Sequence, residues 1–320
     1  MKIDKNFFPG WVRKSIAFTI DDGNIVLDKK FINVVKPYGI KGTFNLKSPD
    51  LDKYSPEFYR EFYRGYGISN HCKYHPFPMV PEKRLPIAEE KFNSVTADKN
   101  KLYKTPVDGL YRIFHNNSYW AYIAEPEVYC RLVDEGKRDI EAVFGEGSIT
   151  TFVWPYCEPG SEEIQDYVIN KAGYKAVRKT GNLKDSTNFS LPRDRGHWTY
   201  NAGYNVLTEV SELYEKYPDD GELKFFSFGI HSHDYERNNC WDSLIDFAKK
   251  FGNRPETYYY ATVEEIFEYE DAVNALIETD DGIENPSDVS VYIKIDGERI
   301  ILAPKSKIKY SFFTDNDIQY

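Results

Sequence analysis

The stretch Ser15-Ile-Ala-Phe-Thr-Ile-Asp-Asp-Gly23 joins a short apolar run to two adjacent carboxylates, and it indicates both the fold class and the position of a candidate site. The apolar residues predict a buried strand, and Asp21 and Asp22 come at its carboxyl end. Such a pair is also common in polar turns and helix caps. It therefore indicates a function only if other polar residues meet it in space.

Two histidines, His71 and His75, follow a later strand in the segment Ser69-Asn-His-Cys-Lys-Tyr-His-Pro76. Their four-residue spacing places both imidazoles on one face of a helical turn, a common way to present two ligands to one ion. The chain has only 6 histidines in 320 residues, so this pair is more clustered than indifferent placement would give. We expect a His/His/Asp metal site in which one carboxylate of the Asp-Asp pair is left free to accept a proton from water.

A further pair of histidines, His231 and His233, follows the strongly apolar strand expected at 223–230. Alternation along an extended segment places both imidazoles on the same side of the chain. Only one of them is needed as a proton donor, and the other would pack beside the site. For His115 and His197 we expect packing roles.

The composition is that of an ordinary globular protein and argues against a polyanionic partner. The net charge is −10 and no long basic run is present, so the sequence lacks the charge pattern of a nucleic-acid-binding protein. No apolar run approaches the roughly 18 residues needed to cross a bilayer. The first residues lack the apolar core of a signal peptide, so we expect a cytoplasmic protein, or a secreted one if a signal preceding Met1 has been removed.

Apolar strands alternate with amphipathic helical stretches from about residue 15 to residue 276, which predicts βα units around a mostly parallel sheet or barrel. Strands are expected at 15–20, 42–46, 66–70, 150–154, 174–178, 223–230 and 257–261, and helices at 27–35, 55–63, 126–144, 161–172, 206–217, 241–251 and after Thr262. These seven strands are one fewer than in a closed eightfold barrel. Because strand ends gather at one rim of a barrel, we expect Asp21, His71, Tyr156 and His231 to converge.

Residues 77–125 interrupt this alternation and are expected to be an insertion. Two strand-like runs within it flank Asn116-Asn117, a pair that tolerates positive φ, so a β-hairpin is expected. The hairpin would lie near the metal because it follows His75 closely. Its tyrosines and Trp120 either stack on a sugar or pack against the barrel.

The end of the chain is expected to lie outside the barrel. The acidic segment 278–288 is interpreted as a linker, and 289–302 as a hairpin with a turn at Asp296-Gly297. We therefore expect a barrel at 1–277 and a linker with a small C-terminal β-hairpin at 278–320.

Six stretches of the sequence form an ordered set of motifs. They are Phe18-Thr-Ile-Asp-Asp-Gly23, Gly39-Ile-Lys-Gly-Thr-Phe44, Ser69-Asn-His-Cys-Lys-Tyr-His-Pro76, Phe152-Val-Trp-Pro-Tyr156, Gly229-Ile-His-Ser232 and Tyr260-Ala-Thr-Val-Glu-Glu-Ile266. In content and order this set resembles the motifs of the polysaccharide deacetylases, carbohydrate esterase family 4. The resemblance covers roughly residues 12–272 outside the insertion.

The resemblance implies an α/β fold, a distorted (β/α)7 barrel, that removes N- or O-linked acetyl groups from a carbohydrate with one divalent metal ion. Mapped by motif, Asp21 would be the general base and His231 the general acid. The backbone amide of Tyr156 would help to hold the oxyanion. The metal ligands would be Asp22, His71 and His75. Zinc is the expected metal, and cobalt, nickel or manganese would also suit these ligands.

The chain departs from the family pattern in the fourth strand, where many members carry an arginine and this chain has Val153. Arg178, at the end of the next strand, either orients and tunes Asp21 or is an ordinary surface arginine. The aspartate-tryptophan motif that often supports the catalytic histidine is matched only loosely, by Asp194 and Trp198.

The expected substrate is an acetylated carbohydrate, and the residues expected to contact it are Trp154, Tyr156, Trp120 and His233. Two other functions fit the same sequence. A metal-dependent amidase could use the same residues on a substrate that is not a sugar. The missing arginine also allows a barrel that binds carbohydrate without turning it over.

Overall fold

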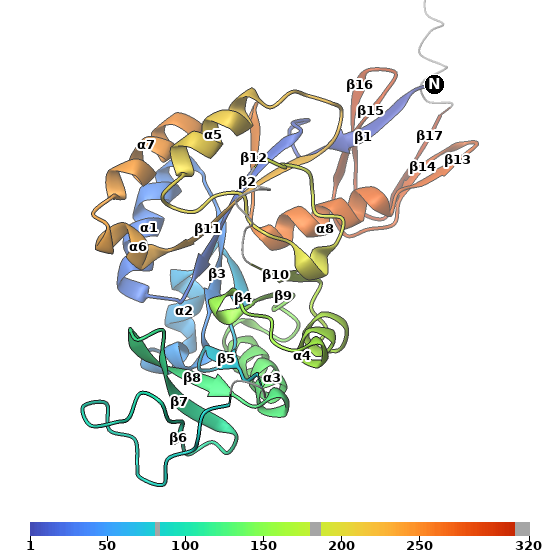
Figure 1. Cartoon of the computed structure of the whole chain (residues 1–320). Coiled ribbons are helices and arrows are strands. Elements are labelled where there is room, and N and C mark those ends of the chain that lie inside the picture. The colour runs from blue at the N-terminus through green and yellow to red at the C-terminus, as the bar shows by residue number, and fades with distance from the viewer. Residues whose placement is uncertain (81–83, 180–186, 311–320) are drawn as a thin grey trace, which may run out of the picture.

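A curved parallel sheet lies at the centre of the computed structural model, which describes residues 1–80, 84–179 and 187–310 (Figure 1). Its strands follow the order β10-β9-β4-β3-β2-β11, and β12 (Tyr258–Tyr260) pairs with the first half of β2. The other strands are β2 (Lys14–Asp21), β3 (Gly42–Leu46), β4 (Gly67–Asn70), β9 (Thr151–Val153), β10 (Ala176–Arg178) and β11 (Lys224–His231). This arrangement is the distorted (β/α)7 barrel expected from the sequence.

The barrel is closed incompletely between β10 and β11. The chain between these two strands runs across the gap and makes isolated bridges, which join Trp198 to Arg178 and Ala202 to Phe228. Within the described residues, isolated bridges rather than a continuous strand therefore connect β10 with β11.

The register of the sheet aligns the candidate residues at the rim. His231, the last residue of β11, is the register partner of Asp21, the last residue of β2. On the other side of β2, Asp21 pairs with Asn45 of β3. Val153 of β9 and Arg178 of β10 are also register partners. Residues that are distant in sequence therefore end their strands at the same level of the barrel.

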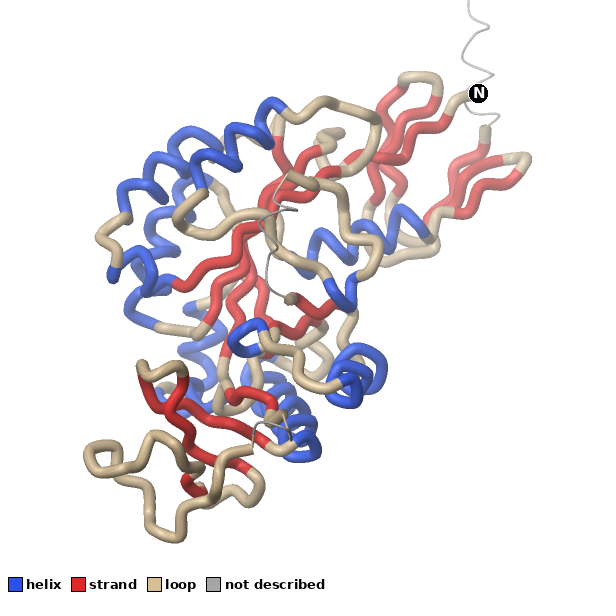
Figure 2. Tube along the Cα trace, viewed as in Figure 1, coloured by secondary structure: helices blue, strands red, loops and turns tan. Residues whose placement is uncertain are grey.

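Helices cover the outside of the sheet, as the alternating pattern predicts (Figure 2). They are α1 (Ile25–Val35), α2 (Pro56–Phe62), α3 (Pro126–Phe144), α4 (Glu162–Asp166), α5 (Leu207–Lys216), α6 (Ser232–Arg237), α7 (Trp241–Phe251) and α8 (Val263–Asn274). Ser55 caps α2, and Thr262 forms a capping box with Glu265 at the start of α8, as predicted. The single helix expected over 161–172 is interrupted instead, because a π-helical turn at Tyr167–Lys171 follows α4.

Aromatic packing fixes β2 just before the two carboxylates. The ring of Phe18 stacks on that of Phe228 in β11, with centroids 4.6 Å apart. Phe31 of α1 and Phe247 of α7 meet Phe18 edge-on, and all four side chains are buried. Burying a phenylalanine side chain stabilises a fold by about 1.5–3 kcal/mol. The position of Asp21 is thus set by the core beneath it.

Helix α8 closes the opposite end of the barrel. Glu264, in its first turn, accepts hydrogen bonds from the hydroxyls of Thr43 in β3 and Thr151 in β9, at 2.5 and 2.6 Å. A Cβ added at Gly67 in β4 would lie 2.2 Å from Oε2 of Glu264 and 2.6 Å from Oγ1 of Thr43, so a larger residue there would displace this hydrogen-bonded pair. These hydrogen bonds join α8 to two strands, β3 and β9, away from the candidate site.

The insertion forms a sheet of its own, seen at the bottom of Figure 1, with the order β5-β8-β7-β6. Its strands are β5 (Pro76–Pro78), β6 (Tyr103–Lys104), β7 (Leu110–His115) and β8 (Tyr119–Ala124). Strands β7 and β8 are the expected hairpin, and Asn116 and Asn117 in its turn have φ values of 46° and 54°. Because β5 begins directly after His75, the insertion adjoins the candidate metal ligands.

The interpretation of 278–288 as a linker is wrong. The elements in this region are β1 (Ile3–Phe7), β13 (Ile277–Thr279), β14 (Gly282–Asn285), β15 (Val291–Ile295), β16 (Glu298–Leu302) and β17 (Ser306–Lys309). Strand β14 pairs with both β13 and β17. The side chains of β13 are exposed, so β13 shows no alternation of apolar and polar residues. The hairpin of β15 and β16 with its Asp296-Gly297 turn is present, and β1 pairs with β15. Residues 311–320 of the expected extension lie outside the described residues.

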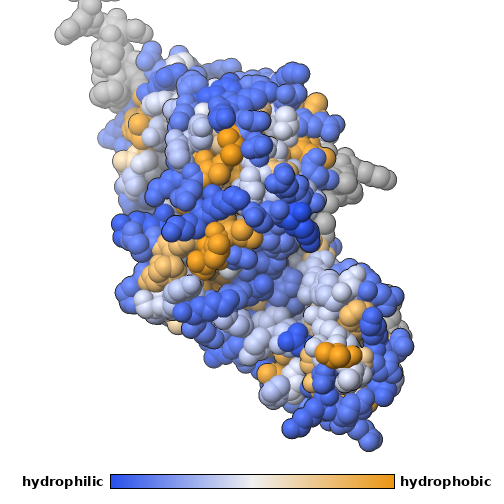
Figure 3. All heavy atoms as spheres, turned by 90° about the vertical axis from the view of Figure 1, so that its left-hand side faces the viewer, coloured by the Kyte–Doolittle hydropathy of each residue, from blue (hydrophilic) through white to orange (hydrophobic). Residues whose placement is uncertain are grey.

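The surface shown in Figure 3 is mostly hydrophilic, with apolar side chains gathered in separate patches. Across the described parts of the chain, no helix has the length and apolar character that crossing a bilayer requires.

Asp28 of α1 is a buried carboxyl group beneath the rim. Its side chain is 0% exposed and accepts hydrogen bonds from the hydroxyls of Ser232 and Tyr63, at 2.7 and 3.0 Å. Burial outweighs both hydrogen bonds and raises the pKa of Asp28 to about 7. The folded protein therefore holds a proton here that the unfolded chain releases at lower pH.

We predict that this group lowers the free energy of unfolding as pH rises from the ordinary aspartate range to about 7, after which its effect is constant. Asp28→Asn keeps the shape of the side chain but cannot ionise. Between pH 4 and pH 8, the difference in stability between variant and wild type should move in favour of the variant, by on the order of 1–4 kcal/mol. Urea unfolding at several pH values measures this difference, and a difference independent of pH would contradict the prediction.

Candidate metal and catalytic centre

Asp22, His71 and His75 come together at the rim, as expected. The Nε2 atoms of the two histidines are 3.0 Å apart. Oδ1 of Asp22 lies 4.0 Å from Nε2 of His71 and 3.7 Å from Nε2 of His75. One carboxylate and two imidazoles thus present three ligand atoms to a common point.

The backbone around the two histidines differs from the expected helical turn. Cys72, Tyr74 and His75 have φ values of 61°, 65° and 52°, in the left-handed region. Asp22 also lies there, with φ of 81°. Each such residue costs on the order of 1–3 kcal/mol and persists only where its surroundings determine it. The spacing of the histidines predicts that their side chains lie close together, but it carries no information about the hand of the backbone between them.

The electrostatics of this group suit a divalent cation. Oδ1 of Asp22 is buried and has no hydrogen-bond partner among the described residues, and the nearest cation is Nζ of Lys47 at 3.3 Å. Burial lowers the pKa of both histidines, that of His75 to about 3. Both imidazoles are therefore neutral, as metal ligands must be. Nδ1 of His71 lies 2.8 Å from the carbonyl oxygen of Val153, which leaves Nε2 free for an ion.

Arg178 holds the neighbouring carboxylate, Asp21, apart from this ligand set. Its Nη2 atom donates to both carboxylate oxygens of Asp21, at 2.7 and 2.5 Å, and Nη1 donates to Oγ1 of Thr19 at 2.9 Å. Asn45 donates a further hydrogen bond to Asp21 at 2.6 Å. Burial alone would raise the pKa of Asp21, but the charge and hydrogen bonds of Arg178, together with the nearby His71 and His231, outweigh burial and lower it. Arg178 is 1% exposed, so the alternative of a surface arginine is wrong.

The position of Arg178 also explains the departure at Val153. The two residues are neighbours across β9 and β10, at the same level of the rim. Arg178 on β10 therefore contacts Asp21, the carboxylate that an arginine on β9 would contact in the family pattern.

His231 faces both carboxylates from the end of β11. Its Nε2 atom lies 4.0 Å from Oδ2 of Asp21 and 3.9 Å from Oδ2 of Asp22. Its Nδ1 atom lies 2.9 Å from Oδ2 of Asp234, whose other oxygen accepts a hydrogen bond from Arg237. Burial lowers the pKa of His231, but the hydrogen bond with Asp234 and the nearby carboxylates outweigh burial and raise it.

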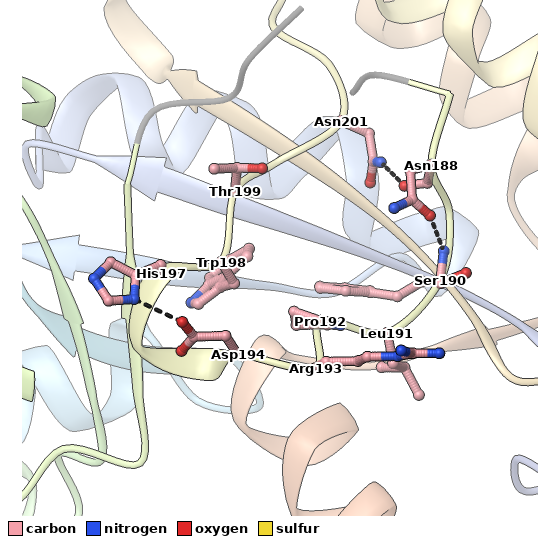
Figure 4. A pocket seen from close by; sticks show the side chains of 11 residues that line it. Asn188, Ser190, Leu191, Pro192, Arg193, Asp194, His197, Trp198, Thr199 and Asn201 are labelled. Atoms are coloured by element: carbon pink, nitrogen blue, oxygen red, sulfur yellow. Dashed lines mark hydrogen bonds and ion pairs between the residues drawn. The ribbon is translucent and has the colours of Figure 1, made fainter. Parts of the chain in front are cut away.

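Asp194 and Trp198 do not support His231. Oδ2 of Asp194 lies 2.8 Å from Nδ1 of His197, on the wall of a separate pocket of about 480 Å³ (Figure 4). Trp198 lines the same pocket. The partner that the sequence analysis missed is Asp234, which could have been found as an acid three residues after the histidine, in the first turn of a helix.

A second group with ligand atoms close together consists of His231, His233 and Asp234. Asp234 is already bonded to His231 and to Arg237. Oδ1 of Asp22, by contrast, lacks a hydrogen-bond partner in the described parts of the chain. The set built around Asp22 is therefore the better candidate for an ion.

The candidate residues line one pocket of about 660 Å³. Trp154, Tyr156 and His233 line it as expected, although α6 begins at Ser232, so the extended alternation predicted through His233 is wrong. The expectation for Trp120 is also wrong, because it packs against other aromatic side chains of the insertion. Successive residues of a strand point to opposite faces, and the neighbouring Tyr119 lines the pocket instead.

Tyr156 is held beside the ligand set in a strained conformation. Its φ is 53°, and its ring meets that of His75 at 4.3 Å and lies flat on that of Phe77 at 3.6 Å. Tight packing of this kind is what allows a non-glycine residue to persist in the left-handed region. The role expected of its backbone amide stays a prediction.

Comparison with known protein families gives one match. The sequence model described as polysaccharide deacetylase matches residues 12–177, which is more than half of the chain. The match includes Asp22, His71 and His75 and ends one residue before Arg178. No curated protein matches the chain in sequence.

Solved structures that are similar to the chain include three carbohydrate-active proteins. One is the Xyl-CE4 domain of a multidomain xylanase from the hindgut metagenome of Trinervitermes trinervoides, with 14% identity over 81% of this chain and 92% of that chain and a TM-score of 0.46. Another is the peptidoglycan deacetylase PdaC from Bacillus subtilis, with 14% identity, coverages of 82% and 94% and a TM-score of 0.46. The third is a family 4 acetyl xylan esterase from Clostridium thermocellum in complex with a cobalt ion, with 15% identity, coverages of 81% and 92% and a TM-score of 0.43.

We predict that the metal-free protein takes up one divalent ion per chain. His75→Ala removes one of three ligands, so the affinity for Zn²⁺ should fall by more than the roughly 10- to 100-fold expected for losing a residue that only supports a ligand. Calorimetric titration with Zn²⁺ measures both stoichiometry and affinity. His197→Ala, remote from the ligand set, is the matched control and should bind as the wild type does. Equal affinities in the two variants would exclude this ligand set.

Proposed function

The chain belongs to the polysaccharide deacetylase family, and we propose that it hydrolyses acetyl groups from a carbohydrate with one divalent metal ion. The observation that carries this proposal is the division of roles between two adjacent carboxylates. Asp22 faces two neutral imidazoles, whereas Asp21 is paired with Arg178 and faces His231. A ligand set, a base and an acid are thereby available within one pocket.

The ion would be held by Asp22, His71 and His75. Zinc is the default, and cobalt, nickel or manganese also suit one carboxylate and two imidazoles. When bound, such an ion supplies positive charge that lowers the pKa of water and polarises a carbonyl group.

Asp21 would act as the general base that accepts a proton from water. A base must be ionised when the substrate arrives, and the charge of Arg178 favours the ionised form by lowering the pKa of Asp21. The hydrogen bonds from Arg178 and Asn45 also keep the carboxylate from rotating toward the ligand set. Arg178 is in this account a positioning residue, since it acts through Asp21.

His231 would act as the general acid. Asp234 accepts the hydrogen bond from Nδ1, and a protonated imidazole then carries its second proton on Nε2, which faces the pocket. That proton would pass to the departing oxygen or nitrogen of the sugar as the acetyl group leaves as acetate. The proton taken by Asp21 balances the one given by His231.

The backbone amide of Tyr156 would stabilise the negative charge that develops on the acetyl oxygen. A preorganised N–H group aimed at developing charge is an effective source of catalysis. The packing of Tyr156 against His75 and Phe77 supports this role, because it fixes the residue beside the ligand set.

The site geometry argues against one of the two alternative functions and does not distinguish the other from a deacetylase. A barrel that binds carbohydrate without turnover is suggested by the missing arginine at Val153, and Arg178 removes that reason. An amidase acting on a substrate other than a sugar would use the same residues, so the choice of substrate distinguishes it from a deacetylase.

The direct test is an acetate-release assay on acetylated chito- and xylo-oligosaccharides with metal-loaded protein. We predict that wild type releases acetate and that Asp21→Asn lowers kcat by about 10²- to 10⁴-fold, the usual contribution of a general base. Metal content should be the same in both proteins. Hydrolysis of simple amides alone would favour the amidase, and sugar binding without acetate release would favour the non-catalytic barrel.

The pH dependence of the reaction tests the role of His231. An acid must be protonated, so activity is present below the pKa of His231 and is lost as pH rises through it. Asp234 raises this pKa, so Asp234→Asn should move the alkaline limb of the kcat/KM profile to lower pH. Asp194→Asn changes the carboxylate of the remote Asp194–His197 pair and should leave the limb in place. Equal profiles for the two variants would exclude His231 as the acid.

A further inference from the structure

A lysine lies beside the candidate metal ligands. Lys47 comes directly after β3, and its Nζ atom lies 3.3 Å from Oδ1 of Asp22. That oxygen is the atom that faces His71 and His75, so the ammonium group and a metal ion would use the same carboxylate oxygen. In the described parts of the chain, Lys47 is the only lysine or arginine that pairs with Asp22. Because like charges repel, its position opposes metal binding.

The contact between Lys47 and Asp22 is an ion pair without a hydrogen bond. Oδ1 of Asp22 is buried and has no hydrogen-bond partner among the residues that the structure describes. Arg178, by contrast, donates hydrogen bonds to both carboxylate oxygens of Asp21. Hydrogen bonds between charged groups add both strength and a fixed geometry. Asp22 can therefore exchange its cation more easily than Asp21 can.

A second carboxylate is in position to receive Lys47. Oδ2 of Asp50 lies 3.6 Å from Nζ of Lys47. The backbone amide of Asp50 donates to the carbonyl oxygen of Lys47 at 3.0 Å, so the turn after β3 keeps the two residues together. The flexible four-carbon stem of a lysine allows its ammonium group to turn from one carboxylate to the other.

The charges around Asp22 balance differently with and without an ion. Histidine binds a metal ion as the neutral imidazole, so Asp22 is the one charged member of the ligand set. Without an ion, Lys47 compensates its negative charge. A divalent ion alone more than compensates that charge, and Lys47 then adds repulsion. An ion that binds must therefore displace Lys47 from Asp22.

We propose that Lys47 regulates the occupancy of the metal site. It compensates Asp22 while the site holds no ion and turns to Asp50 when an ion binds, so the ion is held less tightly than by the three ligands alone. This inference rests on the proposed function, since it takes Asp22, His71 and His75 as the ligands. Lys47 is then neither a ligand nor a catalytic residue, and it sets the affinity of the site for its ion.

The test measures the affinity of the metal-free full chain for Zn²⁺ by calorimetric titration in competition with a chelator. Lys47→Met keeps the length of the side chain and removes its charge, so the affinity should rise by roughly 10- to 100-fold. Lys53→Met is the matched control, because Lys53 pairs with the same Asp50 at 3.2 Å and its side chain is 65% exposed. This control should bind within about 3-fold of wild type.

Thermal unfolding separates this role from a purely structural one. Metal-free Lys47→Met leaves the charge of Asp22 uncompensated, so its unfolding midpoint should lie below that of metal-free wild type. Saturating Zn²⁺ should remove the difference, because the ion then compensates Asp22. An equal loss of stability with and without Zn²⁺ would overturn the inference.

Asp50→Asn tests where Lys47 turns. Without its second carboxylate, Lys47 stays at Asp22, so the affinity for Zn²⁺ should fall by roughly 3- to 10-fold. In the Lys47→Met background the same substitution should have a smaller effect, which a double-mutant cycle measures. Equal effects in the two backgrounds would exclude Asp50 as the acceptor and overturn the exchange that we propose.

Two negative results have different meanings. An affinity for Zn²⁺ that is the same in Lys47→Met and wild type would overturn the inference and leave the ligand set and the proposed function intact. Failure of both proteins to bind Zn²⁺ would instead overturn the proposed function, on which the inference rests.

Discussion

The buried ion pair between Arg178 and Asp21 determines how two adjacent carboxylates share one site. Asp21 and Asp22 follow each other in the chain, and two neighbouring negative charges in a buried site would push one of them to take up a proton. The guanidinium of Arg178 removes that conflict by compensating Asp21 alone. Asp22 is left to face His71 and His75. Removing either partner of this buried pair would leave the other charge uncompensated, which is strongly unfavourable. The two side chains must therefore stay in contact in the folded protein.

The barrel supplies the framework on which this pair depends. Phe18 and its aromatic neighbours anchor β2, and the parallel register brings Asp21 level with His231. Strain is concentrated around the same rim, where Asp22, His75 and Tyr156 all have positive φ. Such residues are unfavourable by themselves, so the packed core and the stacked rings of the insertion must hold them in place. Stability in the barrel thus supports precise placement at the site.

Much of the fold could be predicted from the sequence, because long amphipathic helices and apolar strands carry strong periodic signals. The strands β13 and β14 carry no such signal, because β13 is exposed and the four residues of β14 include one apolar side chain, Ile283, so the sequence of 278–288 is typical of a linker. The grouping of Asp22, His71 and His75 could be predicted from strand ends and spacing, but the left-handed backbone at His75 depends on tertiary packing. The prediction of Trp120 as a pocket residue is wrong by one position. Neighbouring residues of a strand face opposite sides, and Tyr119 lines the pocket instead. Asp234 was missed because its pairing with His231 depends on a helix that begins directly after the strand.

The central claim is that Arg178 keeps the Asp21 carboxylate ionised in a buried site. Titration of the carboxyl carbon by ¹³C NMR, assigned with Asp21→Asn, measures this directly in wild type and in Arg178→Gln. The account predicts a pKa of Asp21 below the ordinary aspartate range in wild type and a clearly higher pKa in the variant, where Arg178 no longer opposes burial. Identical titration of Asp21 in the two proteins would contradict it.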